Sequence, residues 1–243
     1  MSTFLWGALP YVVIGLLATG LAWRYRYDKF GWTTRSSEVY ESKLLNIASP
    51  MFHYGILFVF AGHIMGLFIP QEWTDAIGMN EHAYHLMSLF AGTAAGILAI
   101  LGILMLIYRR RTNTAVFHAT TTNDKIMYVF LVGAIFMGLW AKLAHANIHE
   151  GYNYRDTIAP WARSIFLLRP RVSDMEGVPL SFQIHAVIGM ALLALIPFTR
   201  LVHMFSAPVQ YLFRPYIVYR TRDPKHLAER PARRGWERID AGR

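Results

Sequence analysis

Residues 46–69 read NIASPMFHYGILFVFAGHIMGLFI. This stretch contains no Asp, Glu, Lys or Arg, and it exceeds the roughly 20 apolar residues that an α-helix needs to cross a bilayer. It nevertheless carries two imidazoles, His53 and His63. Ionisable side chains at membrane depth normally face a protein interior and mark a path for electrons, protons or ions. The stretch therefore predicts both a membrane span and a functional site within it.

Four further apolar runs approach this one in length. Together the five runs predict membrane-spanning helices at about residues 4–23, 46–69, 83–108, 126–146 and 179–205. Hydrophobic residues make up 54% of the 243 positions, which agrees with several buried or lipid-facing helices. We therefore predict an all-α polytopic membrane protein, a five-transmembrane-helix bundle whose membrane domain covers residues 1–213.

Two segments outside the predicted spans also carry a pattern. Residues 156–168 place apolar side chains at helical spacing, which predicts a short helix lying along the membrane interface. Residues 214–243 begin with several aromatic and aliphatic side chains among arginines. We expect this tail to dock a partner subunit rather than to form a solvated end, because it is too apolar for a flexible, solvent-exposed segment.

The distribution of positive charge predicts the orientation of the spans. Segment 24–45 carries five Lys or Arg residues and segment 109–125 opens with three consecutive arginines, whereas segment 70–81 has none. Cytoplasmic loops are enriched in Lys and Arg. We therefore expect a cell inner membrane protein with its N-terminus outside and its C-terminus in the cytoplasm, although the arginines of loop 147–178 depart from the rule.

Charge and cysteine content exclude several classes of function. The net charge of +9 is explained largely by membrane topology, and no basic stripe with interleaved aromatic residues suggests a nucleic-acid partner. The chain has no cysteine. It therefore forms no disulfide, attaches no haem through a CxxCH motif and binds no iron–sulfur cluster through its own thiolates.

The last predicted span carries a second pair of imidazoles, His185 and His203. On an ideal helix these two residues share a face and lie about 27 Å apart along the axis. His53 and His63 are separated by about 15 Å along the axis and by roughly 80° around it. If the two spans face each other, this mismatch requires that they tilt or distort.

The direction of each span predicts how the histidines pair. His53 and His203 both lie near the cytoplasmic surface, whereas His63 and His185 lie nearer the outer surface. Two axial imidazoles leave no open position on a haem iron, which suits electron transfer rather than oxygen binding. We therefore expect two haem b groups, with His53 and His203 as axial iron ligands of the inner one and His63 and His185 of the outer one.

Three stretches around these histidines resemble the cytochrome b (gamma) subunit of respiratory nitrate reductase. They are MFHYGIL at 51–57 leading to Gly62-His63, IHAVIGM at 184–190 and PFTRLVH at 197–203, with supporting motifs at 32–37, 119–122 and 206–212. The resemblance covers roughly residues 10–222 and implies the same histidine assignments. It further implies a subunit in membrane lipid that oxidises menaquinol or ubiquinol near the outer haem. Electrons would then pass inward to an iron–sulfur beta subunit and a molybdenum alpha subunit.

The start of the third span departs from the family pattern. A lysine there helps to form the quinol site of the family, but this chain reads EHAYH at 81–85. Quinol oxidation needs a hydrogen-bond partner and a proton acceptor, so we expect Tyr84 or His85 to serve, with Gly62 leaving room for the quinol ring. The alternative is that His82 and His85 are interfacial residues at a helix end.

Two other functions fit the same residues. One is a homologous cytochrome b subunit of a different quinone-linked cytoplasmic oxidoreductase, because another chain selects the terminal substrate. The other is a haem-free membrane anchor, which would show no haem absorption.

Overall fold

The computed structural model describes residues 2–33, 36–146 and 152–206, and these residues form helices and connecting segments without any strand. Among these described residues, five helical segments are long and apolar enough to cross a membrane, namely Thr3–Tyr27, Leu45–Phe68, Glu81–Thr112, Thr122–Ala144 and Leu180–Phe198. The predicted all-α polytopic class is thereby confirmed. The tail at 214–243, which the sequence predicts to dock a partner, lies outside the described residues.

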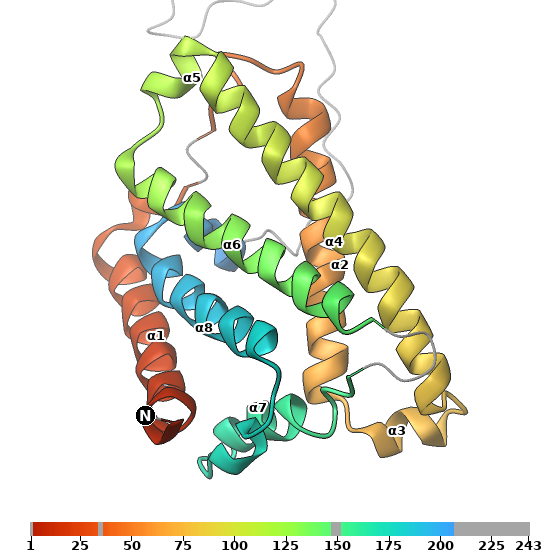
Figure 1. The fold of residues 1–243 in the computed structure, drawn as a ribbon. Coiled ribbons are helices and arrows are strands. Elements are labelled where there is room, and N and C mark those ends of the chain that lie inside the picture. The colour runs from red at the N-terminus through yellow and green to blue at the C-terminus, as the bar shows by residue number, and fades with distance from the viewer. Residues whose placement is uncertain (1, 34–35, 147–151, 207–243) are drawn as a thin grey trace, which may run out of the picture. The chain divides into compact units, whose positions relative to one another are not determined.

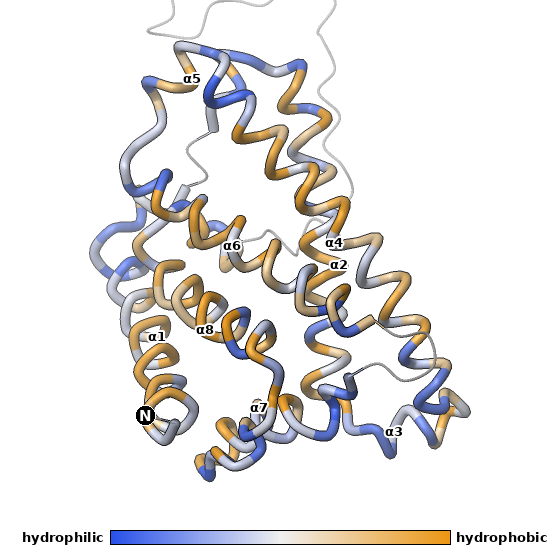
Figure 2. The backbone as a smooth tube through the Cα atoms, viewed as in Figure 1, coloured by the Kyte–Doolittle hydropathy of each residue, from blue (hydrophilic) through white to orange (hydrophobic). Residues whose placement is uncertain are grey.

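Figure 1 gives the order of the elements. The α-helices are α1 (Leu9–Tyr27), α2 (Leu45–Phe68), α3 (Gln71–Ala76), α4 (Glu81–Thr112), α5 (Thr114–His118), α6 (Thr122–Ala144), α7 (Ile158–Phe166) and α8 (Leu180–Leu195). A π-helical segment, Thr3–Ala8, precedes α1, and four 3-10 segments lie at Lys29–Gly31, Val172–Met175, Ile196–Phe198 and Arg200–Ser206. Hydrophobic residues run along the long helices, and hydrophilic residues gather at their connections (Figure 2).

We refer to the two ends of the spans by the short helices that they carry. The α5 end contains the start of α2 and the end of α4, and the α7 end contains α3, α7 and the end of α2 (Figure 1). Local signals set where the spans begin. The Asn80 side chain accepts a hydrogen bond from the backbone N–H of Ala83 at the start of α4, and Thr121 and Asp124 form a capping box at the start of α6.

Helices α2 and α4 pack backbone to backbone through glycines. A Cβ atom added at Gly55 would lie 2.5 Å from the backbone nitrogen of Ala99, and one added at Gly102 would overlap the backbone of Phe52. Small residues of this kind let transmembrane helices approach closely. These contacts also set an antiparallel register in which residue numbers on α2 and α4 sum to about 154.

Helix α7 packs onto the beginning of the chain. The Trp161 indole N–H donates to the backbone carbonyl of Trp6 at 2.8 Å, and the Tyr11 hydroxyl donates to the carbonyl of Ile165 at 3.0 Å. One face of α7 is buried, as the helical spacing in 156–168 predicts. This helix therefore packs on the protein through its apolar face.

The fifth span is interrupted, so the predicted helix over 179–205 is wrong at its C-terminal end. Helix α8 stops at Leu195, two short 3-10 segments follow, and Thr199 between them has an extended backbone with φ −121° and ψ 178°. Pro197 explains the break, because proline lacks an N–H and its ring clashes with the preceding turn. The Arg24 side chain of α1 donates to the Pro197 carbonyl at 2.7 Å, which satisfies a backbone acceptor at the break.

We predict that Gly55→Leu destabilises the fold by about 2 kcal/mol or more, because the new side chain has no space against the α4 backbone. Thermal unfolding of the full chain in detergent measures the effect. Gly15→Leu is the matched control, since nothing lies within 4 Å of a Cβ at that position. Equal unfolding temperatures for the two variants would contradict the proposed packing.

Candidate functional site

The structure brings together His63 of α2 and His185 of α8. Their ring centroids lie 5.8 Å apart, with the ring planes inclined by 42°. The Nδ1 of His63 lies 2.7 Å from the Val59 carbonyl oxygen, and the Nδ1 of His185 lies 3.0 Å from that of Ala134 on α6. Each ring is therefore oriented by a backbone carbonyl.

The second pair joins His53 of α2 to His203 in the 3-10 segment beyond the break. The ring centroids lie 6.3 Å apart. The Nδ1 of His53 lies 2.7 Å from the Ser49 carbonyl oxygen, and the Nδ1 of His203 lies 2.5 Å from that of Arg200. The 18-residue spacing along an unbroken helix thus does not apply, because the chain changes direction between the two histidines of the last span.

These hydrogen bonds determine which nitrogen of each imidazole is free to bind a metal. A carbonyl oxygen only accepts, so each Nδ1 carries the proton and each Nε2 keeps its lone pair for a metal. Two nitrogens that each lie about 2 Å from one metal ion bring their ring centroids to roughly 6 Å, as in both pairs. No cluster of three or more His, Asp or Glu side chains suited to a metal ion occurs among the described residues. The geometry fits axial ligation by two imidazoles.

Two glycines beside the α7-end pair face open positions. Nothing lies within 4 Å of a Cβ built at Gly62, next to His63, or at Gly189, one turn after His185. In the part of the chain that the structure describes, α2 and α8 make few close backbone contacts, whereas α2 packs on α4 and α8 on α6. The two imidazole-bearing helices are therefore separated at the level of the rings.

A cavity of about 470 Å³ adjoins the α5-end pair. Its walls include His53, His203 and the apolar side chains of Phe52, Ile103, Leu131 and Leu201, while Arg109, Arg110 and Arg200 also line it. The volume lies within the range of about 300–1,000 Å³ that ligand pockets occupy. Apolar walls combined with arginines suit a haem, whose ring is apolar and whose propionates are anionic.

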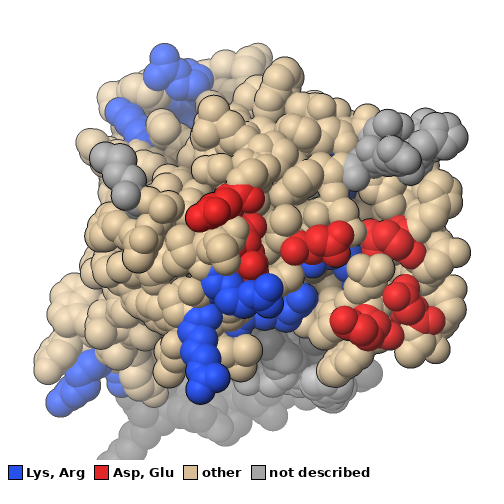
Figure 3. Space-filling view, turned by 60° about the horizontal axis from the view of Figure 1, so that its bottom comes forward, with Lys and Arg blue, Asp and Glu red and all other residues tan. Residues whose placement is uncertain are grey.

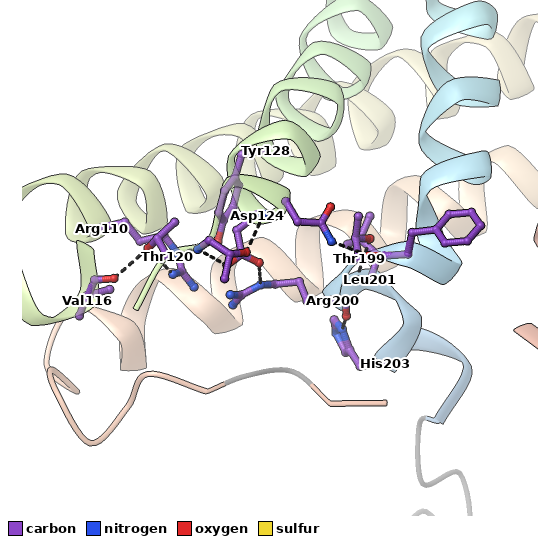
Figure 4. A network of polar contacts seen from close by, with 12 residues as sticks. Arg110, Val116, Thr120, Asp124, Tyr128, Thr199, Arg200, Leu201 and His203 are labelled. Atoms are coloured by element: carbon purple, nitrogen blue, oxygen red, sulfur yellow. Dashed lines mark hydrogen bonds and ion pairs between the residues drawn. The ribbon is translucent and has the colours of Figure 1, made fainter. Parts of the chain in front are cut away.

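The arginines at this cavity differ in their partners (Figure 4). Arg200 pairs with the buried carboxylate of Asp124, its Nε lying 2.7 Å from Oδ1. Arg110 donates to the Tyr128 hydroxyl at 2.8 Å and to the Thr120 hydroxyl at 2.9 Å. Among the described residues Arg110 forms no ion pair although only 8% of it is exposed, so its charge can be neutralised by an anionic ligand.

Arg109 has a structural role. It pairs with the Glu41 carboxylate and donates to Ser37 at two positions, each at 2.8 Å. The Leu44 backbone N–H and the Arg109 guanidinium hold the pKa of the Glu41 carboxyl below its usual value. Arg109 thereby ties the segment before α2 to the end of α4.

A second polar cluster lies at the α7 end, on the side of the molecule that Figure 3 brings forward. The Tyr84 and Tyr154 hydroxyls are 3.0 Å apart, and the Arg155 guanidinium lies 4.0 Å from the Tyr84 ring centroid. Arg155 also pairs with Glu81 at 3.3 Å, and a Cβ built at Gly66 would lie 2.5 Å from the Tyr154 hydroxyl. Tyr84 and Arg155 are only 2% and 4% exposed, so this is an interior network.

The three residues that the sequence predicts for a quinol site are spread along the spans. Tyr84 lies within the interior network, His85 is partly buried one residue further on, and Gly62 faces open space. In the register of α2 against α4, Gly62 is level with residue 92, and Tyr84 lies about 12 Å further along the axis. The structure therefore separates Tyr84 and His85 from the level of Gly62.

One polar side chain in the spans was missed by the sequence reasoning. Lys142 of α6 lies inside the predicted span 126–146, and its Nζ donates to the Ser88 hydroxyl of α4 at 2.9 Å. The signal was available, because a lysine at membrane depth is itself a candidate functional residue. The contact of Lys142 with Ser88 could not be predicted from the sequence, because the two residues are far apart in the chain.

Comparison with known proteins matches residues 2–222 to the family model described as nitrate reductase gamma subunit. The chain belongs to the nitrate reductase gamma subunit family. It is 43% identical over 218 residues to the nitrate reductase gamma chain of Bacillus subtilis, covering 90% of this chain and 97% of the relative. It is 33% identical over 223 residues to the respiratory nitrate reductase 1 gamma chain of Escherichia coli, covering 91% and 98%.

A longer relative also belongs in this comparison. The nitrate reductase-like protein NarX of Mycobacterium tuberculosis is 57% identical over 237 residues, which is 97% of this chain. The chain spans 36% of the length of that relative. The region matched to the gamma subunit family contains all four paired histidines.

We predict energetic coupling between Asp124 and Arg200. Asp124→Asn and Arg200→Gln should each destabilise the full chain by about 3 kcal/mol, because each removes one charge of a buried ion pair and leaves the other charge in place. The double variant should lose less than the sum of the two. Thermal or denaturant unfolding in detergent tests this, and losses that add to within about 0.5 kcal/mol would contradict the pairing.

Proposed function

We propose that this gamma subunit is the dihaem cytochrome b that oxidises membrane quinol for a respiratory nitrate reductase. The observation that carries the proposal is the pair of facing imidazoles at two levels of the spans, each ring with its Nδ1 on a backbone carbonyl. Family membership supports the link to nitrate reductase.

The residues that would hold the cofactors follow from this geometry. His63 and His185 would bind one haem b, and His53 and His203 the other. Haem iron with two axial imidazoles supplies one-electron transfer without an open coordination position. At the α5 end, Arg110 is suited to bind a propionate because its described hydrogen-bond partners are neutral hydroxyls.

The two histidine pairs would carry electrons across about half of the hydrocarbon core, which is about 30 Å thick. His53 and His63 are separated by about 15 Å along α2. The positive-inside rule places the α5 end, with Arg109, Arg110 and Arg111, in the cytoplasm. Protons released from quinol at the α7 end and electrons delivered at the α5 end would then conserve about 2.3 kcal/mol per charge for each 100 mV of membrane potential.

The remaining chemistry requires partners. A chain without cysteine cannot bind an iron–sulfur cluster through its own thiolates, so an iron–sulfur beta subunit and a molybdenum alpha subunit would receive the electrons and reduce nitrate. The quinol would bind near the His63–His185 pair, with Gly62 leaving room for its ring and Tyr84 and His85 toward the α7 end.

We predict two spectrally distinct b haems in reduced-minus-oxidised spectra of membranes containing the full chain. His63→Ala should remove one component and His53→Ala the other, because each variant leaves one iron with a single imidazole. Quantifying both components by redox titration measures the effect.

His82→Ala is the matched control, because His82 is exposed at the start of α4 and belongs to neither pair. It should retain both components. A complete haem spectrum in either ligand variant would contradict the assignments, and the absence of haem from the unaltered protein would favour the membrane anchor.

We predict the orientation of the spans from single-cysteine labelling, for which this cysteine-free chain is a ready background. In intact cells, Glu72→Cys near the α7 end should react with a membrane-impermeant maleimide, and Arg111→Cys near the α5 end should react only after lysis. Both positions are exposed. The reverse pattern would contradict the proposed direction of electron flow.

A further inference from the structure

The lysine between α6 and α4 occupies a position that the proposed haem ligands do not explain. Lys142 is the basic residue in the last turn of α6, yet its side chain runs across Gly92 of α4. A Cβ built at Gly92 would lie 3.1 Å from its Cε and 3.2 Å from its Nζ. The absence of a side chain at Gly92 lets the end of the lysine lie against the α4 backbone without displacement.

The position of Lys142 along the axis of the spans follows from the register of α2 against α4 and from the contact of α6 with His185. Gly92 is level with Gly62 of α2, because residue numbers in contact between α2 and α4 sum to about 154. On α6, a Cβ built at Gly138 would lie 2.8 Å from the His185 ring, and Lys142 follows one turn later, about 6 Å along the axis. Lys142 therefore lies close to the level of the His63–His185 pair.

The α4 face that Lys142 contacts also faces α2. Ser88, Gly92 and Ala99 fall within about 40° of one another around the helix, and Ala99 packs against Gly55 of α2. The hydrogen bond between Lys142 and Ser88 is thus directed toward the α2 side of α4. Gly62, with open space around it, lies on α2 at the same level.

We propose that Lys142, positioned by Ser88, is a quinol-binding residue of the α7-end site. The inference rests on the proposed function and adds a residue to that site. The lysine amino group carries three donors, and the Ser88 hydroxyl occupies one of them. A further donor binds a ring oxygen of the quinol, and both the hydroxyl oxygen of the quinol and the carbonyl oxygen of the quinone accept such a hydrogen bond.

This assignment places the polar contact nearer to the His63–His185 pair than Tyr84 and His85 are. Ser88 is one turn from Tyr84 along α4, about 6 Å along the axis. Tyr84 is already engaged with Tyr154 and Arg155. Lys142 of α6 and Ser88 of α4 would thus lie beside the ring of the quinol, and the tyrosine network lies between them and the α7 end.

The test uses native membranes that contain the full complex, with menadiol as the quinol. The rate of haem b reduction is followed against menadiol concentration, and dithionite then gives the total reducible haem. Lys142→Met should raise the half-saturating menadiol concentration about tenfold, because it removes a charged hydrogen-bond donor. The dithionite-reduced spectrum should not change. Lys142→Arg, which retains donors, should recover part of the loss, and Ser88→Ala should cause a smaller loss in the same direction.

Lys125→Met is the matched control, since Lys125 is exposed near the start of the same helix, and it should behave like the unaltered protein. An unchanged menadiol dependence in Lys142→Met would overturn the proposal. So would a loss of dithionite-reducible haem in parallel with the rate, because that result indicates a packing role. If the unaltered protein has no reducible haem, or menadiol does not reduce it, the proposed function fails before any variant is compared.

Discussion

The contact between the backbones of α2 and α4 determines how the rest of this protein is arranged. Without a hydrophobic driving force between helices in lipid, close packing through small residues decides which faces meet. Gly55 faces α4, and His53 lies about 160° away from it around α2. Once the glycine face is packed, this imidazole projects away from α4, toward the segment that carries His203. The proposed prosthetic groups would therefore lie where α2 makes few close contacts with α8.

Backbone carbonyls complete this arrangement by orienting the rings. Val59 and Ser49 lie one turn before their histidines on α2, so a regular helix supplies those two acceptors. The other two histidines use less regular sources: His185 takes a carbonyl from the neighbouring helix α6, and His203 one from its own 3-10 segment. The break at Pro197 is thus part of the site, because it changes the direction of the chain ahead of His203.

Much of the fold could be predicted from the sequence because membrane-spanning helices consist of long runs of apolar residues. The five spans and the buried face of α7 followed from length and periodicity. The end of the fifth span was predicted too late, because apolar residues continue past Pro197 and the sequence gives no other sign that the helix stops before it. The pairing of histidines could be inferred from span direction alone. The Lys142–Ser88 contact and the network of Tyr84, Tyr154 and Arg155 could not, because they depend on how distant helices rotate against one another.

The positions of the histidines along the chain have a consequence for biogenesis. One imidazole pair joins the second span to the last span and the other joins it to the 3-10 segment that follows, so the partners are 122 and 150 residues apart in the chain. A ribosome that has released only the first four spans has made one half of each pair and neither pair in full. Both proposed haem sites would therefore be completed late and close together in time, after the last span has entered the bilayer.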